Sequence, residues 1–333
     1  MSATKVSTIT MKSFHLVSVL TIVLLAGTAY AGEGRMHQGT IRGVVTAPAI
    51  EPASVPAAQE STVTAIVSAK GTRKAGAIPA KPLATKSVAV LVLDQQTGAT
   101  IYGKNADVVL PIASITKLMT AMVVLDANLP MQDLIPIGED DVDTLKGTRS
   151  RLKVGTHLTR EELLRLALMA SENRAASALS HAYPGGSDAF MLAMNRKARE
   201  LAMRDTLFVD PTGLTSANVS TAHDLVKLVD ASYRYAAIRE YTTAATYDVR
   251  INGRDQTFRN TNRLVKNDTW QIGLSKTGFI NEAGRCLVMQ ARLAQKNVVI
   301  VLLDSWGKYT RTADANRIRK WLESVPLKPS ASS

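Results

Sequence analysis

Three short motifs in the chain carry side chains that could form and activate a nucleophile. In chain order they are an SxxK sequence, an SxN sequence and the chain's only KTG sequence: Ser114 with Lys117, Ser171 with Asn173, and Lys276 with Thr277 and Gly278. A serine hydroxyl becomes a strong nucleophile when a base removes its proton, and a lysine whose pKa is lowered by burial can be that base. The pattern indicates acyl transfer.

Each motif also has an ordinary structural interpretation when it is taken alone. Lys276 could protect an edge strand from aggregation, Asn173 could face solvent, and Ser171 could hydrogen-bond to its own helix backbone. Further copies of SxxK include those that begin at Ser150 and Ser305, and SxN recurs at Ser216. It is the ordered set of three motifs that favours the catalytic interpretation.

A helix is expected to position the first motif. Pro111 precedes a run of good helix formers from Ile115 to Leu125, and the helix should begin at about Ala113. Three residues along a helix bring Lys117 to the same face as Ser114, and the helix N-terminus favours negative charge near the serine.

Helices are also expected in the middle of the chain, ahead of the third motif. Two capping-box patterns precede apolar periodic segments, at Thr159 with Glu162 and at Thr221 with Asp224. The first of these segments, residues 163–170, leads directly into the second motif.

Strands are predicted near both ends of the folded part. Residues 87–93 and 99–102 read as a hairpin, and a strand pattern returns at about Gly273 and continues through residues 285–293 and 298–304. Strands that enclose a helical middle predict an α+β fold in which the terminal segments share one sheet.

Two features near the C-terminal end have structural interpretations. A last helix at 313–324 places Ile318, Trp321 and Leu322 on one side, and packing on the sheet is preferred to a membrane-surface role because this stripe is short. Cys286, the only cysteine, lies in an apolar run and is predicted to be an inert buried thiol. Without a second cysteine, a CxxC pair or an HExxH sequence, we expect no disulfide, metal or cofactor.

The composition agrees with a folded protein that has a basic surface. The 333 residues are 46% hydrophobic and 20% charged, which argues against a disordered, fibrous or disulfide-stapled chain. The net charge of +12 suggests an anionic partner, but aromatic residues are only 5% and the basic residues are scattered. A nucleic-acid partner is therefore not expected.

The N-terminal part reads as an export signal followed by a tether. In residues 1–31 an apolar stretch of about twelve residues, too short for a permanent membrane span, ends in Ala29-Tyr30-Ala31, a small-x-small cleavage pattern. Met11 is an alternative start. Residues 32–86 form a Pro/Ala-rich linker that is expected to be disordered. The folded domain is assigned to 87–326 and a tail to 327–333.

The three motifs in this order are typical of penicillin-binding proteins and class A β-lactamases. Over residues 87–326 the chain resembles the low-molecular-mass penicillin-binding proteins, the serine DD-peptidases that hydrolyse D-alanyl bonds in peptidoglycan. Within that family it is most similar to the D-alanyl-D-alanine endopeptidases of the penicillin-binding protein 7 kind. The similar passages include residues 111–120, 169–176, 210–214 and 275–280.

The resemblance implies a fold and a set of catalytic roles. The fold would be α+β and DD-peptidase/β-lactamase-like, with an antiparallel sheet of N- and C-terminal strands, helices on its faces and an inserted helical subdomain. Ser114 would form the acyl-enzyme with Lys117 as its base. Ser171 would relay the proton to the leaving amine, and Asn173 would bind the substrate amide and orient the lysine.

The resemblance also implies the residues that bind the substrate. Lys276 would supply positive charge, Thr277 would help to hold the substrate, and the backbone N–H groups of Ser114 and Phe279 would form the oxyanion hole. Gly278 would leave room for a substrate that pairs with the strand as an added strand.

Several activities share these motifs. Class A β-lactamases also have a Glu-x-x-Leu-Asn segment that activates water, and this chain lacks it, so β-lactams are expected to inhibit. Only 55 residues follow Gly278, too few for the extra domain and anchor helix usual in carboxypeptidase relatives. The predicted function is a periplasmic endopeptidase, free of a membrane anchor, that cleaves D-alanyl to meso-diaminopimelate crosslinks. The alternatives are a carboxypeptidase that trims pentapeptides and a non-catalytic peptidoglycan-binding protein.

Overall fold

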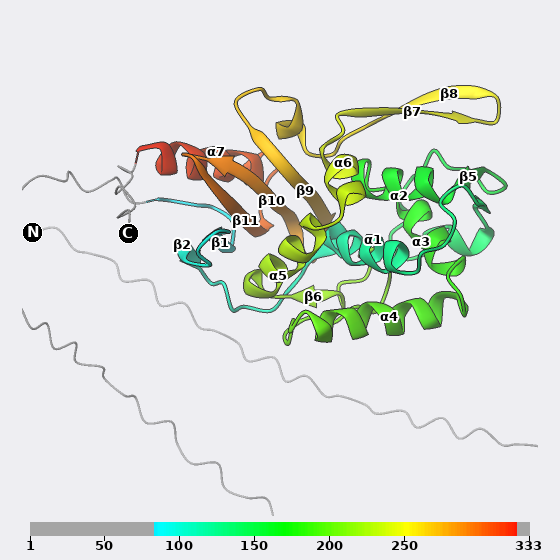
Figure 1. Cartoon of the computed structure of the whole chain (residues 1–333), viewed down its shortest axis with the longest axis horizontal. Helices are drawn as coiled ribbons and strands as arrows, with labels where there is room; N and C mark the ends of the chain where they lie inside the picture. Colours follow the sequence, from blue (N-terminus) through cyan, green and yellow to red (C-terminus); the bar gives the residue numbers. More distant parts are fainter. Residues whose placement is uncertain (1–82, 325–333) are drawn as a thin grey trace, which may run out of the picture. The chain divides into compact units, whose positions relative to one another are not determined.

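A five-stranded antiparallel sheet forms one side of the molecule in the computed structural model, which describes residues 83–324 (Figure 1). The strand order is β2-β1-β11-β10-β9. The bounds are β1 Ala89–Asp94, β2 Thr100–Lys104, β9 Gln271–Ile280, β10 Gly284–Leu293 and β11 Lys296–Ser305. Because β1 pairs with β11, the first and last strands lie side by side. The predicted α+β fold with a shared terminal sheet is confirmed.

The central strands are apolar on both faces because helices cover both. Val90 of β1 packs in the cluster that contains Ile318 and Leu322 of helix α7, Thr310–Ser324, while Leu91 packs with the remaining helices. The alternation along the strand thus separates the two layers. The preference for packing the last helix on the sheet is confirmed, although it begins three residues earlier than predicted.

The other side of the molecule is helical. Helix α1 is buried over most of its surface, which fits its largely apolar sequence. The helical elements are η1 Ala113–Thr116, α1 Lys117–Asp126, η2 Glu139–Asp141, α2 Arg160–Met169, α3 Asn173–His181, α4 Gly186–Glu200, α5 Ala222–Tyr233, α6 Ala236–Thr243 and η3 Arg263–Lys266. Short strand pairs join its loops: β3 Leu110–Pro111 with β6 Val219–Ser220, and β4 Leu134–Pro136 with β5 His157–Thr159.

The two predicted capping boxes have different outcomes. Thr159 and Glu162 bond reciprocally at the start of α2, as expected. At α5, Thr221 accepts a hydrogen bond from the N–H of Asp224, but the Asp224 carboxylate turns away to the N–H of Asp205. Of the two hydrogen bonds of a capping box, only the one accepted by Thr221 forms at α5, because the Asp224 carboxylate instead accepts a hydrogen bond from the loop that contains Asp205.

One hairpin in the helical middle was not anticipated. Strands β7 Thr246–Ile251 and β8 Arg254–Arg259 pair across a turn formed by Asn252 and Gly253, both with positive φ. Asn-Gly between extended runs is a strong hairpin signal and could have predicted it.

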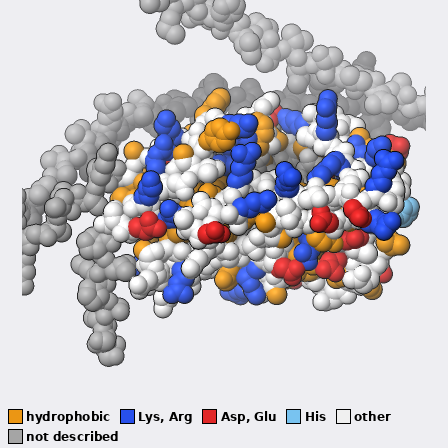
Figure 2. Space-filling view, turned by 90° about the horizontal axis from the view of Figure 1, so that it is seen from above, with side chains coloured by type: hydrophobic (Ala, Val, Ile, Leu, Met, Phe, Trp, Pro, Cys, Tyr) orange, Lys and Arg blue, Asp and Glu red, His pale blue; other side chains and the backbone are white. Residues whose placement is uncertain are grey.

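The basic residues of the surface are spread out. Figure 2 shows Lys and Arg side chains scattered over the face seen from above Figure 1, with acidic side chains interspersed. Within residues 83–324, no helix is both long and apolar enough to cross a bilayer. The predicted signal peptide, most of the linker and the tail lie outside the described residues.

Candidate active site

The first motif sits at the junction of η1 and α1, in the centre of the molecule. Lys117 is completely buried, and its Nζ lies 2.8 Å from Ser114 Oγ, 2.7 Å from Asn173 Oδ1 and 2.7 Å from the carbonyl oxygen of Thr212. Ser114 itself is half-buried. The geometry brings the predicted nucleophile and base into direct contact.

The surroundings of Lys117 favour its uncharged form. Burial lowers the pKa of the amine to about 7, against the opposing charges of Asp210 and Glu172. A neutral amine has two N–H donors and one lone pair. The two carbonyl oxygens, of Asn173 and Thr212, can take the donors, and the lone pair is then left for the Ser114 hydroxyl. The site is built for a lysine that accepts the serine proton.

The second motif lies in the turn between α2 and α3. Ser171 adopts φ +62°, a left-handed conformation that is costly for a residue with a side chain, and this conformation is part of the sharp reversal between the helices. Its Oγ accepts a hydrogen bond of 2.8 Å from Lys276 Nζ. Asn173 begins α3, and its Nδ2 donates to Thr148 Oγ1, which leaves Oδ1 for Lys117. Ser171 is therefore not a back-bonded helix serine.

The third motif lies on β9, the edge strand of the sheet. Lys276 is buried, and its Nζ also donates to the carbonyl of Thr277 at 3.0 Å. Its pKa is well below the usual lysine range, first because of burial and then because of the charges of Lys117 and Arg311. The predicted positive charge on Lys276 is thus disfavoured, chiefly by its burial.

Two glycines hold the backbone around the nucleophile. Ala113 has φ +47°, another strained position. A Cβ on Gly213 would lie 2.0 Å from the carbonyl oxygen of Ala113, and one on Gly278 would lie 2.8 Å from that of Ile112. The predicted reason for Gly278 was room for substrate, whereas in the structure that space is occupied by the backbone that leads to Ser114.

The loop of residues 210–214, one of the passages that resemble the DD-peptidase family, completes the site, although no role was predicted for it from the sequence. Asp210 Oδ1 accepts hydrogen bonds of 2.6 Å from the backbone N–H groups of Thr212 and Gly213, which aims the Thr212 carbonyl at Lys117. Asn218, from the discounted SxN copy, is buried and donates to Thr116 Oγ1. The sequence signal that could have identified this loop is Asp-Pro-Thr-Gly, in which a carboxylate accepts hydrogen bonds from its own turn ahead of a glycine.

Arg311 was also missed. This arginine lies at the start of α7 and donates to the carbonyls of Gly278 and Cys286, at 2.8 and 3.0 Å, so it links β9 to β10 beneath the KTG motif. Burial lowers its pKa to about 10. Nothing in its local sequence distinguishes it from the other arginines of the helix.

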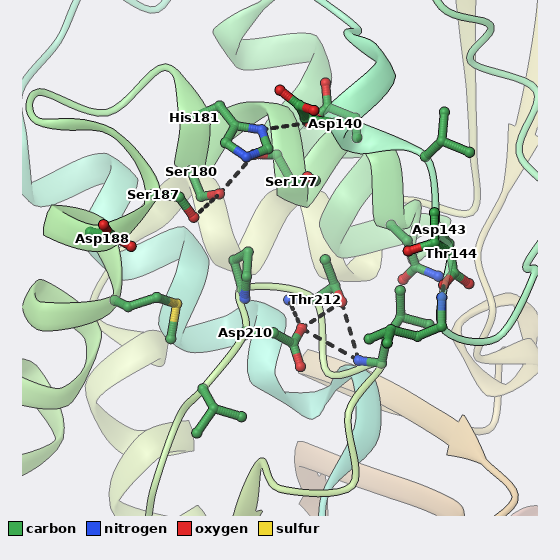
Figure 3. A pocket seen from close by; sticks show the side chains of 18 residues that line it. Asp140, Asp143, Thr144, Ser177, Ser180, His181, Ser187, Asp188, Asp210 and Thr212 are labelled. Atoms are coloured by element: carbon green, nitrogen blue, oxygen red, sulfur yellow. Dashed lines mark hydrogen bonds and ion pairs between the residues drawn. The ribbon is translucent and has the colours of Figure 1, made fainter. Parts of the chain in front are cut away.

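A cavity of about 340 Å³ opens on the helical side of the site and is acidic (Figure 3). Asn173 and Thr212 belong to its wall, together with Asp143, Asp188 and His181. His181 Nδ1 lies 2.8 Å from Asp141 Oδ1. Within residues 83–324, no group of three or more histidine, cysteine or acidic side chains is placed to hold a metal ion.

Comparison with known proteins decides the family. Residues 76–307 match the family model described as D-alanyl-D-alanine carboxypeptidase, which covers more than half of the chain. The chain belongs to the D-alanyl-D-alanine carboxypeptidase family. This agrees with the resemblance to serine DD-peptidases inferred from the motifs.

Within the D-alanyl-D-alanine carboxypeptidase family the chain is similar to proteins named endopeptidases. A D-alanyl-D-alanine endopeptidase of Pseudomonas aeruginosa is 49% identical over 79% of this chain and 85% of its own, and one of Escherichia coli (strain K12) is 47% identical over 73% and 79%. Among solved structures, the Streptomyces K15 DD-transpeptidase is 29% identical, with a TM-score of 0.68, over 74% of this chain and 99% of its own. The predicted DD-peptidase fold is confirmed.

Proposed function

We propose that this protein is a serine DD-endopeptidase that hydrolyses D-alanyl to meso-diaminopimelate crosslinks in peptidoglycan. The observation that carries the proposal is the buried Lys117 amine, which has a lowered pKa and lies 2.8 Å from the Ser114 hydroxyl. A non-catalytic binding protein has no need of such a costly buried base.

The first half of the reaction follows from these contacts. Ser114 Oγ attacks the D-alanyl carbonyl while its proton passes to Lys117 Nζ. The carbonyl oxygen becomes an anion, which the backbone N–H groups of Ser114 and Phe279 stabilise. Ser171, whose hydroxyl is held by Lys276, passes its proton to the amine as the C–N bond breaks and receives the proton that Lys117 took from Ser114, so that Lys117 is neutral again. The acyl group is left as an ester on Ser114.

Hydrolysis of that ester completes the cycle. Water attacks the acyl carbonyl, Lys117 takes its proton, and Ser114 regains a proton as the ester bond breaks. Asn173 and the Thr212 carbonyl hold the lysine throughout, and Thr277 on the edge strand helps to hold the substrate as it pairs with β9.

The endopeptidase specificity is favoured by the identities of 49% and 47% to proteins of that name. The second candidate is a carboxypeptidase, which the family description favours. Both would form the same acyl-enzyme, so β-lactams are expected to acylate Ser114 in either case. Peptidoglycan lies outside the cytoplasm, so we expect the protein to act in the periplasm after cleavage of the proposed signal in residues 1–31.

The test uses purified protein and its Ser114→Ala variant with fluorescent penicillin and with crosslinked muropeptide dimers. The parent protein should be labelled and should convert dimers to monomers, and the variant should do neither. Equal labelling of both proteins, or dimers left intact by the parent protein, would contradict the proposal. Release of D-alanine from pentapeptides with dimers untouched would favour the carboxypeptidase.

A further inference from the structure

A second cavity, of about 370 Å³, lies beyond the end of β9 and differs in character from the acidic one. Phe279, Arg285, Trp306 and Lys308 are among its lining residues, and we call it the basic hollow. It begins at Phe279, the residue after the KTG motif, and is therefore continuous with the proposed catalytic strand.

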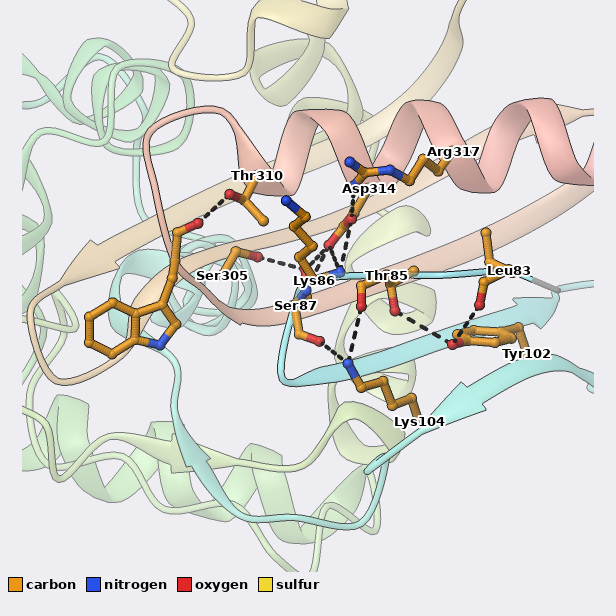
Figure 4. A network of polar contacts seen from close by, with 11 residues as sticks. Leu83, Thr85, Lys86, Ser87, Tyr102, Lys104, Ser305, Thr310, Asp314 and Arg317 are labelled. Atoms are coloured by element: carbon orange, nitrogen blue, oxygen red, sulfur yellow. Dashed lines mark hydrogen bonds and ion pairs between the residues drawn. The ribbon is translucent and has the colours of Figure 1, made fainter. Parts of the chain in front are cut away.

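The aromatic surface of the basic hollow is unusually exposed. Trp306 is 75% exposed and Phe279 49%, although both are large apolar side chains. The backbone under Trp306 is fixed: its carbonyl accepts a hydrogen bond from Thr310 Oγ1 at the start of α7, and the preceding Ser305 side chain bonds to Ser87 (Figure 4). An exposed indole on a rigid backbone is suited to contact with a ligand, because little conformational freedom is lost when the ligand binds.

The cations of the basic hollow are not neutralised by the protein. Arg285 lies over the Phe279 ring, 4.3 Å from its centroid, and neither Arg285 nor Lys308 forms an ion pair within residues 83–324. Of the neighbouring carboxylates, Glu282 is already paired with Lys146, and Asp304, which lies against the lining residue Gly284, has its pKa raised by burial. The charge of Arg285 also reaches Arg311, beneath the KTG motif. The hollow is complementary to carboxylates.

The contacts of the active site indicate which part of a substrate would reach this hollow. Ser171, the proposed proton donor to the leaving amine, bonds to Lys276, whereas Phe279 lies three residues further along β9. The leaving group therefore lies toward Lys276, and the acyl side of the substrate extends toward Phe279. An extended peptide advances about 3.3 Å per residue, so two or three residues before the D-alanyl group suffice to reach the hollow.

We propose that the basic hollow is a subsite for the acyl-side arm of the substrate, an anionic peptide whose free carboxylates lie against Arg285 and Lys308 while its apolar surface contacts Trp306. This inference rests on the proposed function, because that function sets the direction of the substrate on β9. It adds a recognition element that the motifs do not contain: substrates with a long anionic arm are favoured over short ones.

The test compares substrates with and without the arm's charge. Two synthetic crosslinked peptides are used, one with free carboxylates on the acyl-side arm and one with these carboxylates amidated. For the Arg285→Ala/Lys308→Ala variant, KM for the free-carboxylate peptide should rise about tenfold, since half-exposed ion pairs each contribute a few-fold. KM for the amidated peptide should change less than twofold. Trp306→Ala should raise KM for both peptides by a similar factor.

Two controls separate failure of the subsite from failure of the proposed function. Acylation by fluorescent penicillin, which lacks the arm, should be unchanged in all these variants. Arg292→Ala/Arg254→Ala removes the same charge from exposed positions, Arg292 being at the opposite end of β10 and Arg254 on the β7–β8 hairpin, and should leave KM unchanged. Equal effects on both peptides in the Arg285/Lys308 variant, or equal effects in the control variant, would overturn the subsite, whereas an inactive parent protein would overturn the function.

Discussion

Lys117 and Asp314 are both completely buried, but burial has different consequences for the two side chains because their hydrogen-bond partners differ. Asp314 in α7 is completely buried, and its carboxylate accepts hydrogen bonds from the backbone N–H groups of Lys86 and Ser87, from Ser87 Oγ and from Arg317 (Figure 4). Lys117 is equally buried, but among residues 83–324 only neutral oxygens, and no carboxylate, lie within hydrogen-bonding distance of its amine. A buried charge with charged and N–H partners stabilises a structure, whereas one without a counter-charge gives up its proton.

The partners of each group explain this difference. The Asp314 contacts fasten residues 86 and 87, just before β1, to the last helix, so they close the sheet where the two chain ends meet. The Lys117 contacts come from η1, α3 and the 210–214 loop, and they converge on one amine. The Asp314 contacts connect the start of the folded part to α7, whereas the Lys117 contacts position the proposed base.

The largest expected effect is on catalysis. Lys117→Met keeps the side-chain length but removes the base, so acylation by fluorescent penicillin should slow by about 10²- to 10⁴-fold. The midpoint of thermal unfolding should stay the same or rise, because a desolvated amine is replaced by an apolar group. A large loss of stability in this variant would contradict the contrast with Asp314.

Asp314→Ala should show the opposite behaviour. Loss of the carboxylate leaves buried N–H groups without acceptors, so the free energy of unfolding should fall by about 3 kcal/mol. Chemical denaturation measures this fall, and penicillin labelling at low temperature should remain close to that of the parent protein. Asp255→Ala, on the exposed tip of the β7–β8 hairpin, is the control and should change neither quantity.

The pH dependence of acylation sharpens the same comparison. Because the pKa of Lys117 is lowered to about 7, its amine is neutral above that pH, and the acylation rate should fall about tenfold per unit below it. Unfolding restores an ordinary lysine, which binds a proton between pH 7 and 10.5. Stability should therefore rise with pH across that window, and Lys117→Met should reduce the slope of this rise, the remainder coming from the buried Lys276, whose pKa is also lowered. An acylation rate that is constant from pH 5 to 9 would exclude Lys117 as the base.

The smallest effect is expected at a third buried group. Cys286 is completely buried, as predicted, and burial raises the pKa of its thiol to about 11, so the thiol stays neutral and has no charge to satisfy. The folded protein should not react with a thiol reagent at neutral pH, and Cys286→Ala should label with penicillin at the parent rate. Rapid modification of the native protein would show that the thiol is accessible.

The local sequence was sufficient to predict several helices and strands and the chain order of the catalytic motifs. The spacing of Ser114 and Lys117, the capping box at Thr159 and the apolar strands are each properties of a few consecutive residues, and the structure has them at about the predicted positions. The β7–β8 hairpin was equally local and was missed only because its Asn-Gly turn was not used.

Contacts between distant segments were decided by the tertiary structure alone. The Thr212 carbonyl reaches Lys117 across 95 residues, and Arg311 reaches Gly278 across 33, and no local pattern shows that the two members of either pair meet. The net charge of +12 likewise did not show that one cavity is acidic and the other basic. A motif specifies which groups are present, but the pKa of Lys117 depends on which atoms exclude water from it, and those atoms are brought together only by folding.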